Sequence, residues 1–174
     1  MHAAPTGPLS RTVNVERLNK DRAEITVEAT PEECAALARD FKIPDIRDLV
    51  GRFRLSGSLT RLHVGGAVAA TVTQVCTVTL EPFEAKVEEP VDVEFTNADI
   101  LSDTDAEDVE LPDPIVNGRI DFGALTAEFL ALGLDPYPRK PGVAFEPVTA
   151  GEDPLPFADL KALKAKLGGG DGAA

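Results

Sequence analysis

A run of carboxylates is the part of this 174-residue sequence whose residue types and spacing come closest to a chemical site. Its members are Asp103, Asp105, Glu107, Asp108 and Glu110. Closely spaced acidic oxygens can bind Ca²⁺, but an EF-hand loop also needs a central glycine and a terminal bidentate glutamate, and neither stands at the required position here. No histidine or cysteine lies nearby to act as a base or nucleophile. We therefore expect no catalytic residue in this run, and expect its carboxylates to bind a basic partner instead.

An enzyme is the least favoured class of protein for this sequence. The remaining enzymatic reading is a nuclease that uses carboxylate-bound Mg²⁺ within residues 99–113. Such sites need ligands that are fixed on rigid elements, whereas these carboxylates lie on a predicted loop.

The two cysteines, Cys34 and Cys76, lie far apart, one on a predicted helix and one in a predicted strand. This spacing fits neither a disulfide framework nor a zinc ribbon. We expect both thiols to pack as small apolar side chains in a reducing, cytoplasmic compartment, without a metal ion or a cofactor. No apolar run approaches the ~20 residues that a membrane span needs, so no membrane contact is expected.

The negative charge of the chain is concentrated in one span. The formal net charge is −13, and residues 81–113 hold 13 Asp and Glu against 1 Lys. Residues 1–80 hold 10 Lys and Arg against 9 acidic residues, and residues 114–174 hold 6 against 8. Because phosphate binding is built from Lys and Arg, this composition disfavours a chain that grips nucleic acid over its whole surface. The negative charge would attract a basic partner protein more readily than RNA. The alternative is that the charge only keeps the chain soluble.

A locally basic segment lies at residues 39–61, which contain six Lys and Arg but only three Asp. Four of its arginines are candidates for contacts with RNA phosphates: Arg47, Arg52, Arg54 and Arg61. A solvated strand face without a ligand is the alternative. RNA binding requires that these side chains gather on one exposed face.

Strand signals centre on residues 71–95, where apolar and polar side chains alternate with the period of two that a half-buried strand requires. The alternation breaks at Glu81-Pro82 and then resumes, which predicts two long antiparallel strands joined at Pro82. The paired Gly65-Gly66 predicts a two-residue hairpin before the first of them. Further strands are expected at residues 12–17, 23–28, 49–62 and 115–121.

Three helices are expected. The first covers residues 31–41, because the sequence Thr-Pro-Glu-Glu that begins at Thr30 can form a capping box. Asp121 can cap a second helix over residues 122–134, whose apolar side chains recur every three or four positions. The third is predicted over residues 156–167, with leucines on one side and lysines mostly on the other.

These elements predict an α+β fold in which a curved, mostly antiparallel sheet or partial β-barrel is flanked by about three helices. Residues 1–167 are expected to form a single domain. Residues 97–113 would be a mobile acidic loop of that domain, and residues 168–174 a flexible tail.

Three segments follow one another in an order that points to a known family. They are QVCTVTLEPF at residues 74–83, GRIDF with the following helix and LGLDPYP at residues 118–138, and PLPFADLK at residues 154–161. The first resembles the Cys-x-x-Cys-x-x-Pro strand and turn of the YceD family, the large ribosomal RNA subunit accumulation proteins. The second is similar to that family's "Ile-Asp-Leu, helix, Leu-Pro-x-x-Pro" segment, and the third to its closing "Asn-Pro-Phe-x-x-Leu" helix. The resemblance spans about residues 60–165.

The sequence departs from the family pattern at its cysteines. Many members have a second cysteine in the first segment and another after the proline-rich segment, a set that could hold a metal ion. Here only Cys76 is present, because Thr79 occupies the second position and residues 137–148 contain no cysteine. A single thiolate cannot build a tetrahedral site, so the resemblance does not imply a metal centre in this chain.

The resemblance implies a bacterial cytoplasmic factor that supports production or stability of 23S rRNA during assembly of the large ribosomal subunit. Genes of the family commonly lie beside the gene of a small, basic large-subunit ribosomal protein. Together with the charge map, this leads to the hypothesis that the acidic run binds that basic protein or the pre-ribosomal particle, while the arginines contact rRNA. A protein that binds rRNA directly through its arginines is the alternative, and no DNA partner is expected.

Overall fold

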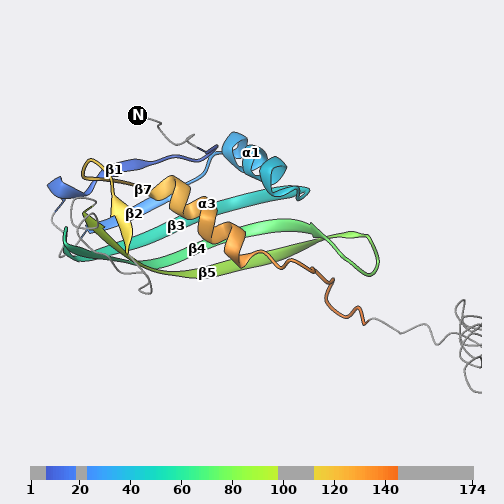
Figure 1. The fold of residues 1–174 in the computed structure, drawn as a ribbon. Coiled ribbons are helices and arrows are strands. Elements are labelled where there is room, and N and C mark those ends of the chain that lie inside the picture. The colour runs from blue at the N-terminus through green and yellow to red at the C-terminus, as the bar shows by residue number, and fades with distance from the viewer. Residues whose placement is uncertain (1–6, 19–22, 98–111, 145–174) are drawn as a thin grey trace, which may run out of the picture. The chain divides into compact units, whose positions relative to one another are not determined.

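The computed structural model describes residues 7–18, 23–97 and 112–144 (Figure 1). The strands are β1 (Thr12–Asn14), β2 (Ala23–Glu28), β3 (Asp45–Ser58), β4 (Arg61–Val75), β5 (Pro82–Asn97), β6 (Asp113–Ile115) and β7 (Arg119–Asp121). The helices are α1 (Pro31–Phe41) and α3 (Phe122–Gly133), with a 3-10 turn at Val15–Arg17. The fold is α+β as predicted, with two α-helices in the described part of the chain. The helix predicted at residues 156–167 and the single-domain prediction extend beyond the described residues.

A five-stranded sheet in the order β2-β3-β4-β5-β6 forms the centre of the fold. Its neighbouring strands are antiparallel, except that β5 and β6 are parallel. β1 and β7 form a separate two-stranded antiparallel sheet. The large sheet ends at β2 on one side and at β6 on the other, so it is open and does not close into the partial barrel that was the alternative expectation.

The prediction of a hairpin turn at Gly65-Gly66 is wrong. The chain reverses between Ser58 and Arg61, and both glycines lie inside β4. A Cβ atom on Gly66 would collide with the backbone carbonyl oxygen of Arg52 on β3. Glycine is therefore needed here because two strands approach closely, which is the other common reason for a glycine in a strand.

The joint between β4 and β5 lies near the predicted place. Val75 is the last residue of β4, and residues 76–81 form a turn before β5 begins at Pro82. The N–H of Cys76 donates to the carbonyl oxygen of Glu81 at 2.9 Å, which closes the turn. Cys76 is buried, as predicted, but it belongs to the turn and not to the strand.

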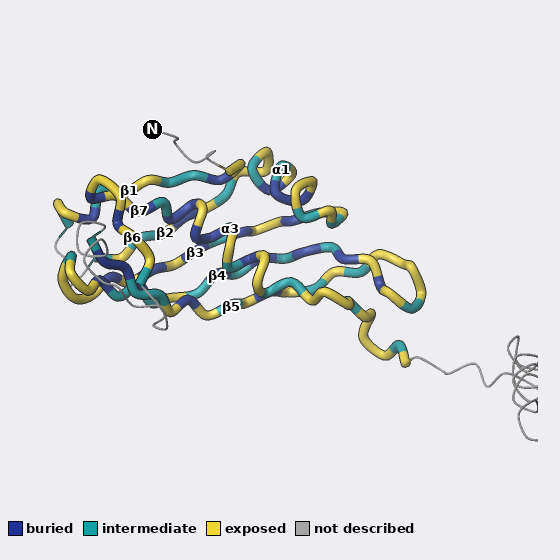
Figure 2. The backbone as a smooth tube through the Cα atoms, in the orientation of Figure 1, coloured by how far each residue is buried: buried dark blue, intermediate teal, exposed yellow. Residues whose placement is uncertain are grey.

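Helix α3 covers one face of the large sheet (Figure 1). Phe122 at the start of the helix packs against Phe53 of β3 with ring centroids 5.2 Å apart, and both side chains are fully buried. Along β3, β4 and β5, residues that face α3 alternate with residues that face away, and Figure 2 shows this alternation as changes between buried and exposed colours. We call the side toward α3 the inner face and the opposite side the outer face.

The start of α3 is bonded to the segment before β1. Asp121 accepts hydrogen bonds from the backbone N–H groups of Gly123 and Ala124, as the predicted helix cap requires. Its carboxylate also accepts bonds from the Arg11 N–H at 2.7 Å and from the Ser10 hydroxyl. Burial by itself raises the pKa of Asp121, but these hydrogen bonds outweigh it and lower that pKa. The cap of α3 thus fixes the segment before β1.

The strand predicted at residues 115–121 is two short strands. β6 pairs with β5 and β7 pairs with β1, so the two strands belong to different sheets. Asn117 and Gly118 both have positive φ angles, 52° and 68°, and this left-handed pair turns the chain between the two strands. The capping box predicted at the start of α1 is present, with Thr30 and Glu33 each accepting from the backbone N–H of the other.

Candidate functional site

The outer face of the large sheet carries the four arginines predicted to contact RNA. Arg47, Arg52 and Arg54 project from β3 and Arg61 projects from β4, each next to residues that point into the core. No described helix covers this face. The structure therefore brings the four side chains to one exposed face, which is the arrangement that RNA binding requires.

Three of these arginines are paired with carboxylates of the same sheet. Arg54 bonds to Glu24 of β2 at 3.0 Å, and Arg61 bonds to Glu94 of β5 at 2.9 Å. Arg47 contacts Glu84 of β5 and also Asp45 on its own strand. All of these side chains are at least 40 % exposed. Exposed ion pairs contribute only about 0–1 kcal/mol each, so a ligand could displace them at small cost.

Arg52 differs from the other three because it makes no ion pair within the described residues. It lines a shallow hollow of about 460 Å³ on the outer face, together with Glu24, Arg54 and His63. Part of the floor is the Gly65-Gly66 segment of β4, which has no side chains to fill the space. His63 is itself hydrogen bonded to Asp92 at 2.6 Å.

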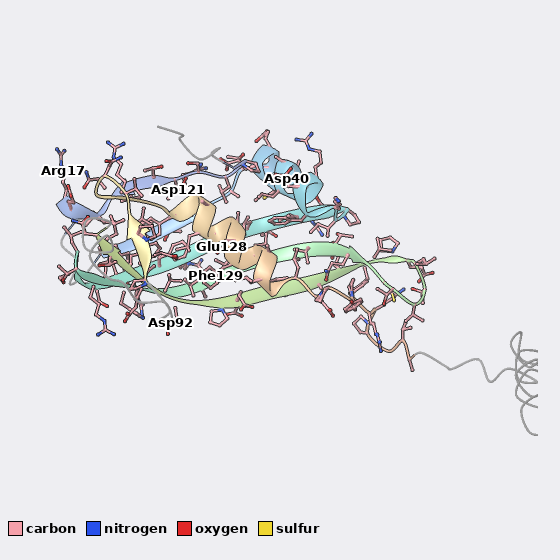
Figure 3. The ribbon with its side chains drawn as sticks, in the orientation of Figure 1. Arg17, Asp40, Asp92, Asp121, Glu128 and Phe129 are labelled. Carbon is pink, nitrogen blue, oxygen red and sulfur yellow. The ribbon has the colours of Figure 1, made fainter. Side chains whose placement is uncertain are left out.

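A row of acidic side chains lies beside these arginines, on β5. The charged residues that point to the outer face from this strand are Glu84, Lys86, Glu88, Asp92 and Glu94. Asp92 projects from β5 on the side away from α3 (Figure 3). We call these five side chains the β5 row. Four of the five are acidic, so the outer face carries basic side chains on β3 and mainly acidic ones on β5.

The acidic side chains that the sequence singled out lie outside the described residues. They are Asp103, Asp105, Glu107, Asp108 and Glu110. Their role in binding a basic partner stays a prediction. Within the ranges that the structure describes, no three His, Cys, Asp or Glu side chains are grouped so that they could hold a metal ion.

Several hydrogen-bond donors surround the sulfur of Cys76 at the tip of the β4–β5 hairpin. The backbone N–H of Lys140 points at its sulfur, with 3.4 Å between nitrogen and Sγ. This donor is the main reason why the pKa of the thiol is lowered from 9.0 to about 6. The hydroxyl and N–H of Thr79 and the N–H of Val78 contribute in the same direction. Cys34 is the opposite case, because burial raises the pKa of its thiol.

The N–H of Lys140 reaches Cys76 because the segment after α3 packs against the hairpin tip. The Gln74 side chain donates to the carbonyl oxygen of Asp135 at 3.0 Å, and the N–H of Thr77 donates to that of Pro138 at 2.9 Å. The ammonium group of Lys140 contacts Glu81 at 3.1 Å. This contact was not predicted, because nothing in the local pattern of residues 135–140 indicates which strand they meet. The arrangement can stabilise a thiolate without a metal ion.

Comparison with known families assigns the chain to one of them. The family model described as "Large ribosomal RNA subunit accumulation protein YceD" matches residues 64–164, more than half of the chain, and the chain belongs to this family. The match begins in β4 and includes β5, the hairpin tip, β6, β7 and α3. The resemblance inferred from three sequence segments is thus confirmed. The family's description links the chain to accumulation of large-subunit ribosomal RNA.

No similar protein was found among those with curated functions, and none among solved structures. No helix in the described ranges is long and apolar enough to cross a membrane.

Proposed function

We propose that this chain is a non-enzymatic cytoplasmic factor that supports 23S rRNA accumulation by holding a basic protein of the large ribosomal subunit, free or within the pre-ribosomal particle. Family membership supports the link to large-subunit rRNA. The net charge of −13 supports a basic protein as the direct partner, since a chain so acidic repels RNA over most of its surface.

The observation that carries this proposal is the acidity of β5 and of the chain that follows it. Four of the five charged side chains in the β5 row are acidic. The sequence then continues directly into the run that contains Asp103, Asp105, Glu107, Asp108 and Glu110. Carboxylates on a fixed strand and in the adjoining segment together offer a large target to a basic chain, and charge complementarity of this kind raises association rates and excludes wrong partners.

Titration of the full chain with the purified basic ribosomal protein tests the proposal. Neutralising Asp103, Asp105, Glu107 and Asp108 to their amides should weaken binding about tenfold at ~0.1 M salt, because four partner charges are removed. Unchanged affinity would show that the acidic run does not bind this partner. Sedimentation of a tagged chain through a ribosome gradient adds the cellular test, since the chain should travel with large-subunit precursors.

Direct binding of rRNA is the second candidate function, and one observation favours it. All four candidate arginines lie on the outer face, and Arg52 makes no ion pair within the described residues. A 23S rRNA fragment that binds the chain and loses affinity in the variant Arg52→Ala/Arg54→Ala would favour this function. If the basic ribosomal protein instead binds the natural chain and this variant equally well, the result would favour the first function, binding of a basic protein.

A further inference from the structure

One edge of the five-stranded sheet is open. β6 pairs with β5 only over residues 95–97, so no described strand covers β5 from Pro82 to Asp92 (Figure 1). An edge strand presents unpaired N–H and C=O groups to which another extended chain can add. The surface next to these groups then decides which chain is accepted.

The register of the ladder shows which backbone groups face the open edge. The Cys76–Glu81 hydrogen bond directly follows the last β4–β5 pair, so the odd-numbered residues of β5 bond to β4 and the even-numbered ones face away from it. The pairing between β5 and β6 independently shows that the even-numbered residues of β5 face away from β4. Pro114 of β6 has no N–H, so its partner Thr96, an even-numbered residue, must supply the hydrogen bonds between these strands.

Two prolines limit how much of the edge can pair. Pro82 and Pro90 are both even-numbered, so their missing N–H groups fall on the open edge and leave the ladder with β4 intact. Prolines and charged side chains at such places reduce pairing with unrelated strands. Between them, Glu84, Lys86 and Glu88 each present an N–H and a C=O. We call residues 84–88 the open segment.

The side chains around the open segment select a basic chain. Glu84 and Glu88 are exposed on the outer face, and Glu89 is half-buried on the inner face. A second copy of this strand would bring glutamates against these carboxylates, and like charges on neighbouring strands are destabilising. Lys or Arg side chains on an incoming strand would instead meet carboxylates at two of the three outer positions, Glu84 and Glu88, which lie on either side of Lys86.

We propose that the open segment of β5 receives an extended basic segment of a partner protein as an added strand. This inference rests on the proposed function and names the surface that performs it. The partner backbone pairs with Glu84, Lys86 and Glu88, and its basic side chains contact the carboxylates on the outer face. Main-chain hydrogen bonds give affinity in this binding mode, and alternate side chains give specificity.

The remaining side chains of the added strand face the C-terminal end of α3. Gly133 packs so closely on Val87 and Glu89 of β5 that a Cβ atom there would clash with Val87. The adjacent Leu132 is 65 % exposed. A partner segment in which Lys or Arg alternates with small apolar residues therefore fits both sides of the edge.

Two variants at one position separate backbone pairing from charge. Lys86→Pro removes an N–H that faces the open edge and leaves the bonds to β4 in place, whereas Lys86→Ala keeps that N–H. Both variants remove the same positive charge. A peptide of about ten residues in which Lys alternates with Val is the probe. Lys86→Ala should bind it as well as the natural chain or a few times better, and Lys86→Pro should bind about tenfold more weakly than Lys86→Ala.

Amide hydrogen exchange gives a second readout that does not depend on variants. Bound peptide should slow exchange at the N–H groups of Glu84, Lys86 and Glu88 in the natural full chain. Thermal unfolding of Lys86→Pro checks that this variant is folded. If it is not folded, amide exchange in the natural chain decides the test.

The failures of the two proposals are distinguishable. If the peptide binds but leaves these amides unprotected, the edge proposal is overturned, while binding of a basic ribosomal protein can still support the proposed function. If the ribosomal protein does not bind but the peptide protects the amides, the proposed function fails and the edge site stands. Protection of the same amides by an rRNA fragment and not by the peptide also overturns the edge proposal.

Discussion

The two faces of the central sheet carry different kinds of side chain on the same strands. On the inner face, Phe53 packs against Phe122 of α3, and the neighbouring side chains are apolar and buried. On the outer face, Arg52 and Arg54 stand on either side of Phe53 in sequence and are exposed. The strand period of two separates these roles completely. We therefore expect stability to depend mainly on the inner face, and side chains on the outer face to be replaceable at little cost to folding.

The largest effect expected from this comparison is at Phe53. Phe53→Ala should lower the free energy of unfolding by about 3–5 kcal/mol, because a fully buried ring is removed and leaves a cavity against Phe122. Arg52→Ala, the adjacent residue on the outer face, is the control and should change it by less than about 0.5 kcal/mol. Urea unfolding measures both. Similar losses in the two variants would contradict the division between faces.

The next effect concerns the cap that ties the segment before β1 to the inner-face helix. Asp121→Ala should cost about 1–3 kcal/mol, because several N–H and O–H donors lose their acceptor. The pKa of Asp121 is lowered from 3.8, so its contribution is present at neutral pH and is lost as pH falls through the pKa of the folded state. Asp121→Ala should therefore unfold with a shallower pH dependence below about pH 4. An unchanged acid unfolding curve would contradict this role.

The cysteines sharpen the comparison, because both are buried but the pKa values of their thiols are shifted in opposite directions. The lowered pKa of Cys76, about 6, means that its stabilising effect is complete above pH 9.0 and is lost as pH falls toward 6. Cys76→Ala should remove this part of the pH dependence of stability, measured by urea unfolding between these limits. Cys34→Ala is the control. The pKa of Cys34 is raised, so its effect has the opposite sign and is lost as pH rises. An unchanged pH dependence in Cys76→Ala would show that the donors do not hold a thiolate.

The smallest effect is expected on the outer face. Arg54→Ala and Arg61→Ala should each change the free energy of unfolding by less than about 1 kcal/mol, since each breaks one exposed ion pair. Raising the salt concentration should reduce even this difference. A loss near that expected for Phe53→Ala would mean that the outer face contributes to folding as strongly as the inner face.

Much of the fold could be predicted because its signals are local. Thr30 and Asp121 cap helices through contacts within four residues, and the alternation along β5 identified its two faces. Gly66 was misread because a glycine needed for close approach of two strands looks the same in sequence as a glycine in a turn. The contact between Lys140 and Cys76 joins residues 64 positions apart, which no local pattern specifies.

The candidate site was predicted in part for the same reason. The outer-face position of the arginines follows from strand alternation, but the cross-strand carboxylates that pair with Arg54 and Arg61 depend on register. The open edge of β5 depends on strand order, which sequence analysis left undetermined. The acidic composition of β5 was visible at once, whereas its unpaired backbone was not.

The affinity of the basic ribosomal protein for two variants of equal net charge tests whether β5 holds this partner. The first neutralises three acids of the β5 row, Glu84→Gln, Glu88→Gln and Asp92→Asn. The second neutralises three exposed acids elsewhere, Glu28→Gln, Glu32→Gln and Glu128→Gln. Titration at ~0.1 M salt should show binding about tenfold weaker for the first variant and nearly unchanged for the second. Equal affinities for the two variants would contradict the claim that β5 is the surface that holds a basic partner.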